Sequence, residues 1–252
     1  MAATNDACTL QDQAYQTLRQ AIIFAQLKPG QRLAPKSICE ELELGRTPVR
    51  ESLVRLQQQG LVRTVPQSGT FVSKIDGHAA ESARFTREHL ESQIAIECCA
   101  VAREEDFARL DAIIEEQQAA VAARDEREFF ITDNRMHELL FEIANRHEVW
   151  EWLALTNTHF ERFRWLAAVT KGVSWDIVMS QHLQIRDAIA RRSPSDVAYL
   201  ISLHLHKALA DHKDVVAEHP EYFEESEALL GPTWGRSKCS LASHDEAVAA
   251  ER

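Results

Sequence analysis

The sequence has few residues that break a helix over most of its length, and it has no apolar run of membrane-spanning length. Between His78 and Leu230 the only glycine is Gly172, and no proline occurs between Pro66 and Pro194. A stretch this long without helix breakers, rich in Ala, Leu, Glu and Arg, predicts packed helices. The missing apolar run excludes a transmembrane helix, which needs roughly 20 consecutive apolar residues.

Cysteine is scarce and poorly arranged for cross-linking. The five cysteines are an odd number, and no two of them form a Cys-x-x-Cys pair. A disulfide framework and a cysteine-ligated zinc site are therefore not expected, and a reducing cytoplasm is the expected location. The first residues also lack a basic stretch followed by an apolar core, so we expect no secretory signal.

Basic residues are outnumbered by acidic ones, but the acidic excess lies in one part of the chain. The 252 residues have a net charge of −11, yet residues 1–77 hold nine Lys or Arg and seven Asp or Glu, a net of +2. Residues 78–252 have a net of −13 and contain all 11 histidines. The overall charge therefore does not exclude a nucleic-acid partner, because the first part is slightly basic.

A domain boundary is expected near Ile75–His78, where the charge, glycine content and histidine content all change. We expect residues 1–77 to form one domain and residues 78–217 to form a helical second domain. The composition of residues 218–252 predicts a weakly ordered tail. The short join near Ile75–His78 is the expected hinge between the two domains.

The first part has the pattern of three helices followed by a β-hairpin. Thr9 is placed to cap the first helix, a second helix follows Pro35, and a third opens at residues 45–48 and ends at Gly60. Two β-prone runs then flank a turn at residues 66–69. This order of elements predicts a winged helix-turn-helix, which places its third helix in the major groove of DNA.

The third predicted helix carries Arg46, Arg50 and Arg55 on the face opposite its apolar residues. A guanidinium group pairs bidentately with guanine or binds phosphate, so this face fits the major groove. Lys36 on the preceding helix is placed to contact the DNA backbone, and Gly69 in the hairpin can approach a minor groove closely. A basic helix face taken alone is more often only a solvated surface, but these arginines stand where the motif needs them.

Five motifs run in order through the first part, namely Tyr15-x-x-Leu18-Arg19, Leu27-x-Pro29-Gly30-x-x-Leu33, Arg46-Thr47-Pro48-Val49-Arg50-Glu51, Leu56-x-x-x-Gly60-Leu61-Val62 and Gly69-x-x-Val72. In these residues the first part of the chain resembles the DNA-binding domain of the GntR family of bacterial transcription regulators. The resemblance implies that Lys36, Arg46, Thr47 and Arg50 contact double-stranded operator DNA, with Gly69 at the tip of the wing.

Three positions depart from the pattern of that family. Gly45 stands where serine is usual, so a capping hydroxyl is absent, although glycine is a tolerated cap. Glu43 stands at the usual turn glycine, and Lys36 replaces an arginine, which gives a point charge in place of a planar fork. These differences bear on the operator sequence and leave the expected DNA binding in place.

The second part divides into predicted helices near residues 79–103, 105–124, 126–145, 148–169, 174–191 and 195–217. Asp133 and His137 lie four residues apart on one of them, so they share a face. His182 and His204 lie beside apolar residues of the last two helices. One carboxylate and three imidazoles suit a divalent metal ion such as zinc, nickel or manganese.

The residues alone do not select these three histidines. Five others lie in the same part of the chain: His147, His159, His206, His212 and His219. A single histidine in such a place is more often a core or surface residue with a hydrogen-bond partner. His206 is the main rival of His204, although it points about half a helix turn away.

Further motifs in the second part are Arg87-x-x-Leu90-Glu91, Asp133-x-x-x-His137-x-x-Leu140, His182-x-x-Ile185-x-x-Ala188-Ile189 and His204-Leu205. They resemble the FCD effector domain of the FadR subgroup of GntR regulators, an all-helical antiparallel bundle, over about residues 79–215. The resemblance implies Asp133, His137, His182 and His204 as ligands of a divalent metal ion. It also implies a small carboxylate effector, often a sugar acid or a central metabolite, that the metal can hold.

Three further residues are candidates for binding the effector. Arg87 can neutralise a carboxylate, because a guanidinium fork matches its geometry; the equal alternative is an ion pair with Glu91 or Glu88. Asn157 and Arg164 lie seven residues apart on one predicted helix face and can line the same cavity. Their alternative is a polar rim on an amphipathic helix.

These features predict a mainly α protein, with an N-terminal winged helix-turn-helix followed by an all-helical bundle. The expected function is a cytoplasmic, homodimeric repressor that reads a palindromic operator and responds to a carboxylate, with no membrane partner. The alternatives are a metal-dependent hydrolase with a DNA-binding appendage and an architectural nucleic-acid binder. We expect no enzyme, because no nucleophile motif or further pair of carboxylates accompanies the candidate metal ligands.

Overall fold

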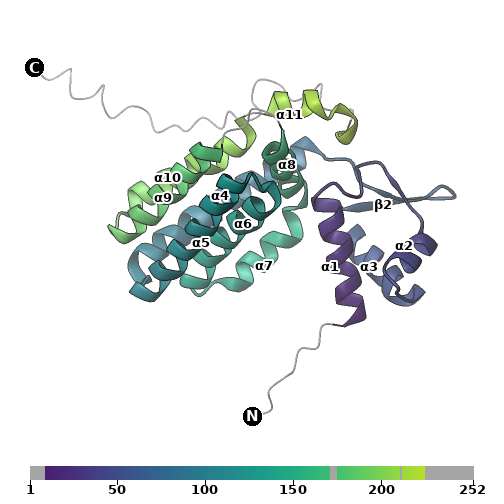
Figure 1. Cartoon of the computed structure of the whole chain (residues 1–252), viewed down its shortest axis with the longest axis horizontal. Coiled ribbons are helices and arrows are strands. Elements are labelled where there is room, and N and C mark those ends of the chain that lie inside the picture. Colours follow the sequence, from purple (N-terminus) through teal and green to yellow (C-terminus); the bar gives the residue numbers. More distant parts are fainter. Residues whose placement is uncertain (1–8, 171–174, 211, 225–252) are drawn as a thin grey trace, which may run out of the picture.

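The computed structural model describes residues 9–170, 175–210 and 212–224. A small domain with three helices and a sheet lies beside a larger bundle of helices (Figure 1). The predicted fold class, a winged helix-turn-helix followed by an all-helical domain, is confirmed. Among the described residues, no helix is long and apolar enough to cross a membrane.

The small domain contains the three predicted helices, α1 (Leu10–Ile23), α2 (Pro35–Glu41) and α3 (Arg46–Gln58). The Thr9 hydroxyl accepts a hydrogen bond from the Asp12 amide at 3.1 Å, which caps α1. Gly60, just after α3, has a φ of +72°, in the left-handed region that glycine favours at helix ends.

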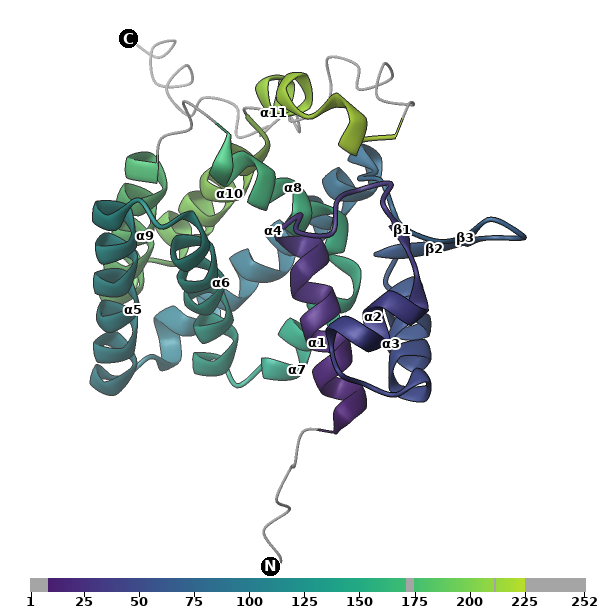
Figure 2. The ribbon, with the colours of Figure 1, turned by 45° about the vertical axis from the view of Figure 1, so that its right-hand side comes forward.

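The hairpin consists of β2 (Val62–Val65) and β3 (Gly69–Val72) and projects away from the helical domain (Figure 2). A third strand, β1 (Arg32–Leu33), pairs antiparallel with β3 and gives the order β1-β3-β2. The sequence analysis missed β1 because two residues show no alternating pattern.

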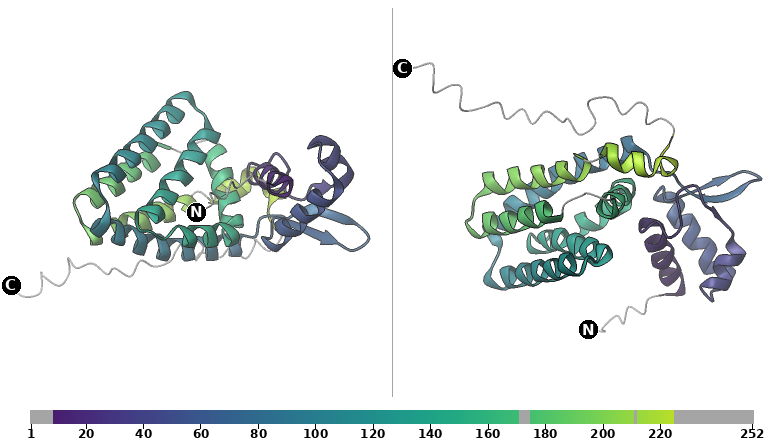
Figure 3. Two further views of the ribbon diagram at one scale, coloured as in Figure 1. Left: turned by 90° about the horizontal axis from the view of Figure 1, so that it is seen from below. Right: turned by 45° about the horizontal axis from the view of Figure 1, so that its top comes forward.

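The helical domain begins with the long helix α4 (Gly77–Val101), which packs against α6, α8, α9 and α10 (Figure 3). The other helices are α5 (Glu104–Ala123), α6 (Glu126–Ile143), α7 (His147–Thr156), α8 (Thr158–Val169), α9 (Trp175–Ala190), α10 (Pro194–Ala210) and α11 (His212–Glu218). Leu, Ile, Phe and Ala side chains fill the space between them. The bundle therefore brings residues of distant helices together in its interior.

One of the predicted helices is divided in two, and another corresponds to two described helices. The helix predicted at residues 148–169 is interrupted at Asn157, which ends α7 and precedes α8. Asn favours such positions because its side chain competes for backbone hydrogen bonds. The helix predicted at residues 195–217 corresponds to α10 and α11.

The join between the domains is held in place on one side by α8. A guanidinium nitrogen of Arg162 donates to the Ser73 carbonyl at 2.7 Å, and the Asp76 amide donates to His159 Nδ1 at 3.0 Å. Arg162 is almost fully buried, and burial lowers its pKa to about 9. The join that the sequence predicts as the hinge is therefore held by hydrogen bonds to α8 in this structure.

The other side of the join pairs with a short segment near the end of the described chain. The Ile75 amide donates to the Tyr222 carbonyl at 2.9 Å, and the Glu224 amide donates to the Ile75 carbonyl at 3.1 Å. Phe223 between them is 2% exposed and packs in the helical core. Of the residues predicted as tail, 222–224 thus pair with the join, whereas 225–252 lie outside the described residues.

Helix α8 also contacts the small domain directly. Glu161 pairs with Arg19 of α1 at 2.5 Å, and the Thr158 hydroxyl donates to the Gln59 carbonyl at the end of α3 at 2.8 Å. Trp165 of α8 packs edge-on against Phe24, which follows α1, with 4.8 Å between ring centroids. One helix of the bundle therefore holds the first helix and the end of the third helix of the winged domain.

Candidate metal centre and nucleic-acid interface

The four predicted metal ligands converge in the interior of the helical domain. Asp133 and His137 come from α6, His182 from α9 and His204 from α10, and one ligand atom of each lies within 4.8 Å of the others. All four side chains are buried. His137 Nε2 lies 3.1 Å from His204 Nε2, and His182 Nε2 lies 3.4 Å from Asp133 Oδ1.

These distances fit a shared ion. Two ligand atoms that each lie about 2.0–2.1 Å from one zinc ion in a tetrahedral site are roughly 3.3 Å apart. His182 Nε2 makes no hydrogen bond of standard geometry with the residues that the structure describes, although it is fully buried. A buried nitrogen without a donor or acceptor loses free energy unless something else occupies that position.

Each imidazole is oriented by an acceptor on its outer nitrogen. His182 Nδ1 lies 2.9 Å from Gln117 Oε1, and His204 Nδ1 lies 3.2 Å from Gln181 Oε1. An amide oxygen can only accept, so these Nδ1 atoms carry the proton and the Nε2 lone pairs point toward the other ligands. This is the tautomer that binds a metal.

His137 has a carboxylate as its outer partner. Its Nδ1 lies 2.8 Å from Glu91 Oε2, an ion-pair distance without hydrogen-bond geometry. Burial lowers the pKa of His137, and burial together with the neighbouring His182 lowers the pKa of His204 well below its ordinary value. Both rings are therefore neutral near pH 7, as metal ligation requires.

Asp133 is ionised because a guanidinium group is in contact with it. Burial alone would raise the pKa of Asp133, but the Arg164 guanidinium outweighs burial and holds the pKa well below its ordinary value. Arg164 Nη2 contacts Asp133 Oδ2, and Arg164 Nη1 donates to Asn134 Oδ1 at 2.8 Å. The cluster therefore contains one ionised carboxylate beside three imidazoles.

Arg87 lies behind the cluster and forms the ion pair that was one of its two expected roles. Its Nε contacts Glu91 Oε1, and both side chains are fully buried. Burial would raise the pKa of Glu91, but Arg87 and His137 lower it to about 2. The two terminal nitrogens of Arg87 have no hydrogen-bond partner among the described residues, and its guanidinium lies 5.4 Å from the Trp150 ring centroid.

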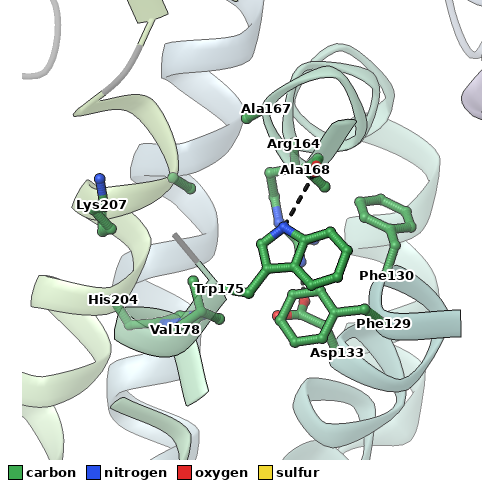
Figure 4. A pocket seen from close by; sticks show the side chains of 11 residues that line it. Phe129, Phe130, Asp133, Arg164, Ala167, Ala168, Trp175, Val178, His204 and Lys207 are labelled. Carbon is green, nitrogen blue, oxygen red and sulfur yellow. Dashed lines mark hydrogen bonds and ion pairs between the residues drawn. The ribbon is translucent and has the colours of Figure 1, made fainter. Parts of the chain in front are cut away.

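A cavity of about 70 Å³ opens beside Asp133, Arg164 and His204 (Figure 4). Its remaining walls are residues that the sequence analysis did not single out as lining residues: Phe129, Phe130, Ala167, Ala168, Trp175, Val178, Lys207 and Ala208. They come from α6, α8, α9 and α10, and no short motif links them. The convergence of these four helices is a tertiary feature without a local sequence signal.

Asn157 does not line this cavity with Arg164, contrary to the sequence prediction. It faces a separate cleft between α7 and the small domain, which Tyr15 and Arg19 also line. The prediction assumed one continuous helix from residue 148 to 169, whereas the chain bends at Asn157. The seven-residue spacing therefore does not place the two side chains on one face.

The predicted DNA-contacting residues lie on the outer surface of the small domain. Arg46, Thr47 and Arg50 are exposed along the first turns of α3 and border an open groove. Lys36 is exposed on α2, with its Nζ 3.8 Å from Glu40. Arg55, further along α3, pairs with Asp12 and stacks on the Tyr15 ring, so its role is to join α3 to α1.

Gly69 stands at the start of β3, opposite Val65, and not at the outermost point of the turn. Its φ is +127°, and a Cβ at this position would lie 3.1 Å from Arg32 Nε. Glycine is required there because of this backbone conformation. The exposed Arg32 on β1 is therefore a basic residue beside the wing that the sequence analysis did not single out.

The histidines left open by the sequence have other surroundings. His206 Nδ1 lies 2.8 Å from the Ser202 carbonyl, outside the cluster, and His159 accepts a hydrogen bond at the domain join. His147 forms a second group with Glu138 and Glu142, but two of its three members are exposed. Among the described residues, the cluster around Asp133 is therefore the better built site.

Comparison with known proteins agrees with both halves of this arrangement. Residues 10–72 match the family described as bacterial regulatory proteins, gntR family, and residues 83–207 match the FCD domain. An HTH-type transcriptional regulator in an unstable DNA locus of Streptomyces ambofaciens is 30% identical over 243 residues, which cover 91% of this chain and 96% of that protein. The HTH-type transcriptional repressor RspR of Escherichia coli K12 is 25% identical over 221 residues, which cover 88% of this chain and 96% of that protein.

Solved structures show the same fold. McbR/YncC of E. coli has a TM-score of 0.69 at 18% identity and covers 85% of this chain and 99% of its own. A GntR regulator from Rhodococcus sp. RHA1, described as putative, has a TM-score of 0.67 at 20% identity. The match covers 83% of this chain and 98% of that protein. At these identities the likeness concerns the fold alone.

The buried Arg87–Glu91 pair yields a stability prediction. Glu91→Gln leaves the Arg87 charge buried without a counter-charge, so it should lower the free energy of unfolding by roughly 3–5 kcal/mol. Glu88→Gln on the same helix is the control, because Arg84 keeps Glu81 as a partner at 2.8 Å. Urea unfolding of the three proteins measures the difference, and equal losses in both variants would contradict the prediction.

Proposed function

Because this chain belongs to the gntR family of bacterial regulatory proteins and carries an FCD domain, we propose that it is a ligand-responsive repressor. Its place in the family makes it a transcriptional regulator with an effector-binding domain. The proposal adds that it represses, acts in the cytoplasm and works as a homodimer on a palindromic operator. The name of the E. coli relative, a transcriptional repressor, supports repression. Residues 1–77 serve as the DNA-binding domain and residues 78–217 as the effector domain.

The exposed basic face of α3 is the observation that supports operator reading. Arg46, Thr47 and Arg50 lie at the start of this helix with no acidic partner among the described residues, whereas Arg55 is paired with Asp12. In helix-turn-helix proteins the first turns of this helix contact base edges. Lys36 contacts phosphate, and Gly69 allows the wing to approach the DNA.

Substitutions on α3 and α2 should separate base contacts from phosphate contacts. Arg50→Ala should weaken binding to the operator by about 1–3 kcal/mol and leave non-specific binding nearly unchanged. Lys36→Ala should weaken binding to all sequences alike and flatten its salt dependence. Gel shifts with operator and scrambled DNA at two salt concentrations test this, and an unchanged operator affinity in Arg50→Ala would refute the assignment.

The buried cluster supports a resident divalent ion held by Asp133, His137, His182 and His204. The fit rests on His182 Nε2, which has no hydrogen bond of standard geometry among the described residues, and on the acceptors at Nδ1 of His182 and His204, which leave the Nε2 atoms facing inward. Zinc, nickel and manganese all accept such ligands, and an ion there supplies positive charge for an effector carboxylate. Arg164 supplies a second positive charge at the edge of the cavity, and Arg87 acts through Glu91, which holds His137.

Metal content provides the test of this site. Purified protein should carry about one divalent ion per chain, as a four-residue ligand set requires. His137→Ala and His182→Ala should lose most of the ion, whereas His206→Ala, outside the cluster, should retain it. Elemental analysis after dialysis measures this, and wild-type protein that remains metal-free after incubation with zinc, nickel and manganese would refute the metal proposal.

An apolar outer surface of α4 and α10 supports homodimer formation. The two helices lie side by side, with the Ser202 hydroxyl 2.6 Å from Glu88 Oε1. Phe85, Tyr199 and Leu203 are 51%, 54% and 42% exposed on these helices. Large apolar side chains that gather on a surface mark an interaction site, and a second copy of the chain is the partner that would give two operator-reading domains.

A metal-dependent hydrolase is the weaker alternative. The ion would have open positions, but the groups around it are already used: Glu91 orients His137, and Asp133 pairs with Arg164. Among the described residues, no further buried carboxylate faces the cavity as a general base. The relatives named above are transcriptional regulators, and the winged domain has no role in hydrolysis, so we propose no enzymatic activity.

Helix α8 is the element through which an effector would act on DNA binding. Arg164 places one of its faces in the cavity, while Thr158 and Glu161 hold the winged domain. An effector changes DNA affinity only if it favours one arrangement of the domains over another. Couplings of about 1–3 kcal/mol are typical and change affinity roughly 5- to 150-fold.

Two threonines allow a matched test of this coupling. Thr158→Val removes the hydroxyl that binds the Gln59 carbonyl, whereas Thr156→Val removes a hydroxyl that binds only Leu153 of its own helix. Operator affinity is measured with and without gluconate, succinate and benzoate. Thr158→Val should reduce the effector-dependent change several-fold, and Thr156→Val should preserve it; equal responses in both variants would refute the role of α8.

A further inference from the structure

The cavity beside the candidate metal centre has mostly apolar walls, with the charged and polar side chains of Asp133, Arg164, His204 and Lys207 among them. Phe129 and Trp175 stack nearly parallel, with 4.9 Å between ring centroids and 5° between planes (Figure 4). Phe130 and Val178 add further apolar surface. The alanines complete the wall: Ala167, Ala168 and Ala208.

Among the lining residues that the structure describes, none is Ser, Thr, Tyr, Asn or Gln. The one indole N–H in the wall is already used, because Trp175 Nε1 donates to the Ala168 carbonyl at 3.1 Å. A ligand hydroxyl buried against these walls would lose its hydrogen bonds to water without gaining others, which costs free energy. A sugar acid, with a hydroxyl on nearly every carbon, therefore fits these walls poorly.

The polar side chains of the wall favour a single negative charge. Arg164 and Lys207 are cationic, and Asp133 is anionic and already in contact with Arg164. The balance is one positive charge before any ion is bound at the cluster. A carboxylate is the group whose charge and shape suit a guanidinium and an ammonium in a buried site.

We propose that the effector is a compact carboxylate with an apolar body that lacks hydroxyl groups, either a single aromatic ring or a short alkyl chain. The proposal rests on the carboxylate-sensing function above and specifies its ligand class. The carboxylate lies by Arg164 and Lys207, and the body lies against Phe129 and Trp175.

Matched ligands test the class directly. Hexanoate and gluconate share six carbons and one carboxylate and differ by five hydroxyl groups, and benzoate adds an aromatic ring. Calorimetric titration of the full chain loaded with zinc should show benzoate or hexanoate binding at least 10-fold more tightly than gluconate. Gluconate binding as tightly as both, or more tightly, would overturn the apolar class while leaving a carboxylate sensor in place.

A wall substitution shows whether the preference arises in this cavity. Val178→Thr keeps the side-chain shape and adds one hydroxyl to the wall, so it should reduce the preference for hexanoate over gluconate at least 3-fold. Val169→Thr is the matched control, because Val169 lies on α8 outside the lining and is 36% exposed. An unchanged preference in Val178→Thr would overturn the proposed site.

A failure of carboxylate sensing itself gives a result different from a failure of the proposed ligand class. If none of the three carboxylates binds the zinc-loaded protein at millimolar concentration, both carboxylate sensing and the ligand class are refuted. If hexanoate and benzoate bind equally well to Lys207→Met and to wild type, the carboxylate does not lie in this cavity, and the proposal fails even though sensing stands.

Discussion

The contact between Arg164 and Asp133 is the interaction on which the arrangement of this protein depends. Both side chains are almost fully buried, and a buried charge is tolerated only when it is paired. Asp133 lies on α6 among the candidate metal ligands, and Arg164 lies on α8. The pair therefore fixes α8 against the bundle, and α8 holds the winged domain through Thr158, Glu161 and Trp165.

The sequence predicted the parts of the protein that have local signals. Thr9, Pro35 and Gly60 mark helix ends through their own backbone chemistry, and Asp133 and His137 share a face by helical spacing alone. The division at Asn157 was missed because the apolar pattern continues across it, and the two-residue strand β1 has no periodicity. The choice of His137, His182 and His204 as partners of Asp133 was predicted from a family resemblance. Composition alone could not choose among the histidines.

The surroundings of the cluster could not be predicted, because they are contacts between helices distant in the chain. Gln117 lies on α5 and Gln181 on α9, and each matters only because it meets the outer nitrogen of a histidine. Neither residue belongs to a motif. The same holds for the apolar cavity: Phe129 and Trp175 are unremarkable aromatic residues until two helices bring their rings into a stack.

The two oxygens of Asp133 have different neighbours, and this bears on how the proposed sites would interact. Oδ2 contacts Arg164, whereas Oδ1 faces His182 Nε2 at 3.4 Å. Asp133 would therefore have Oδ1 available to help the histidines hold an ion, while Oδ2 keeps its contact with Arg164. An effector carboxylate that approaches Arg164 would compete with Oδ2 for the same guanidinium. In the proposed mechanism this competition at Arg164 changes the position of α8.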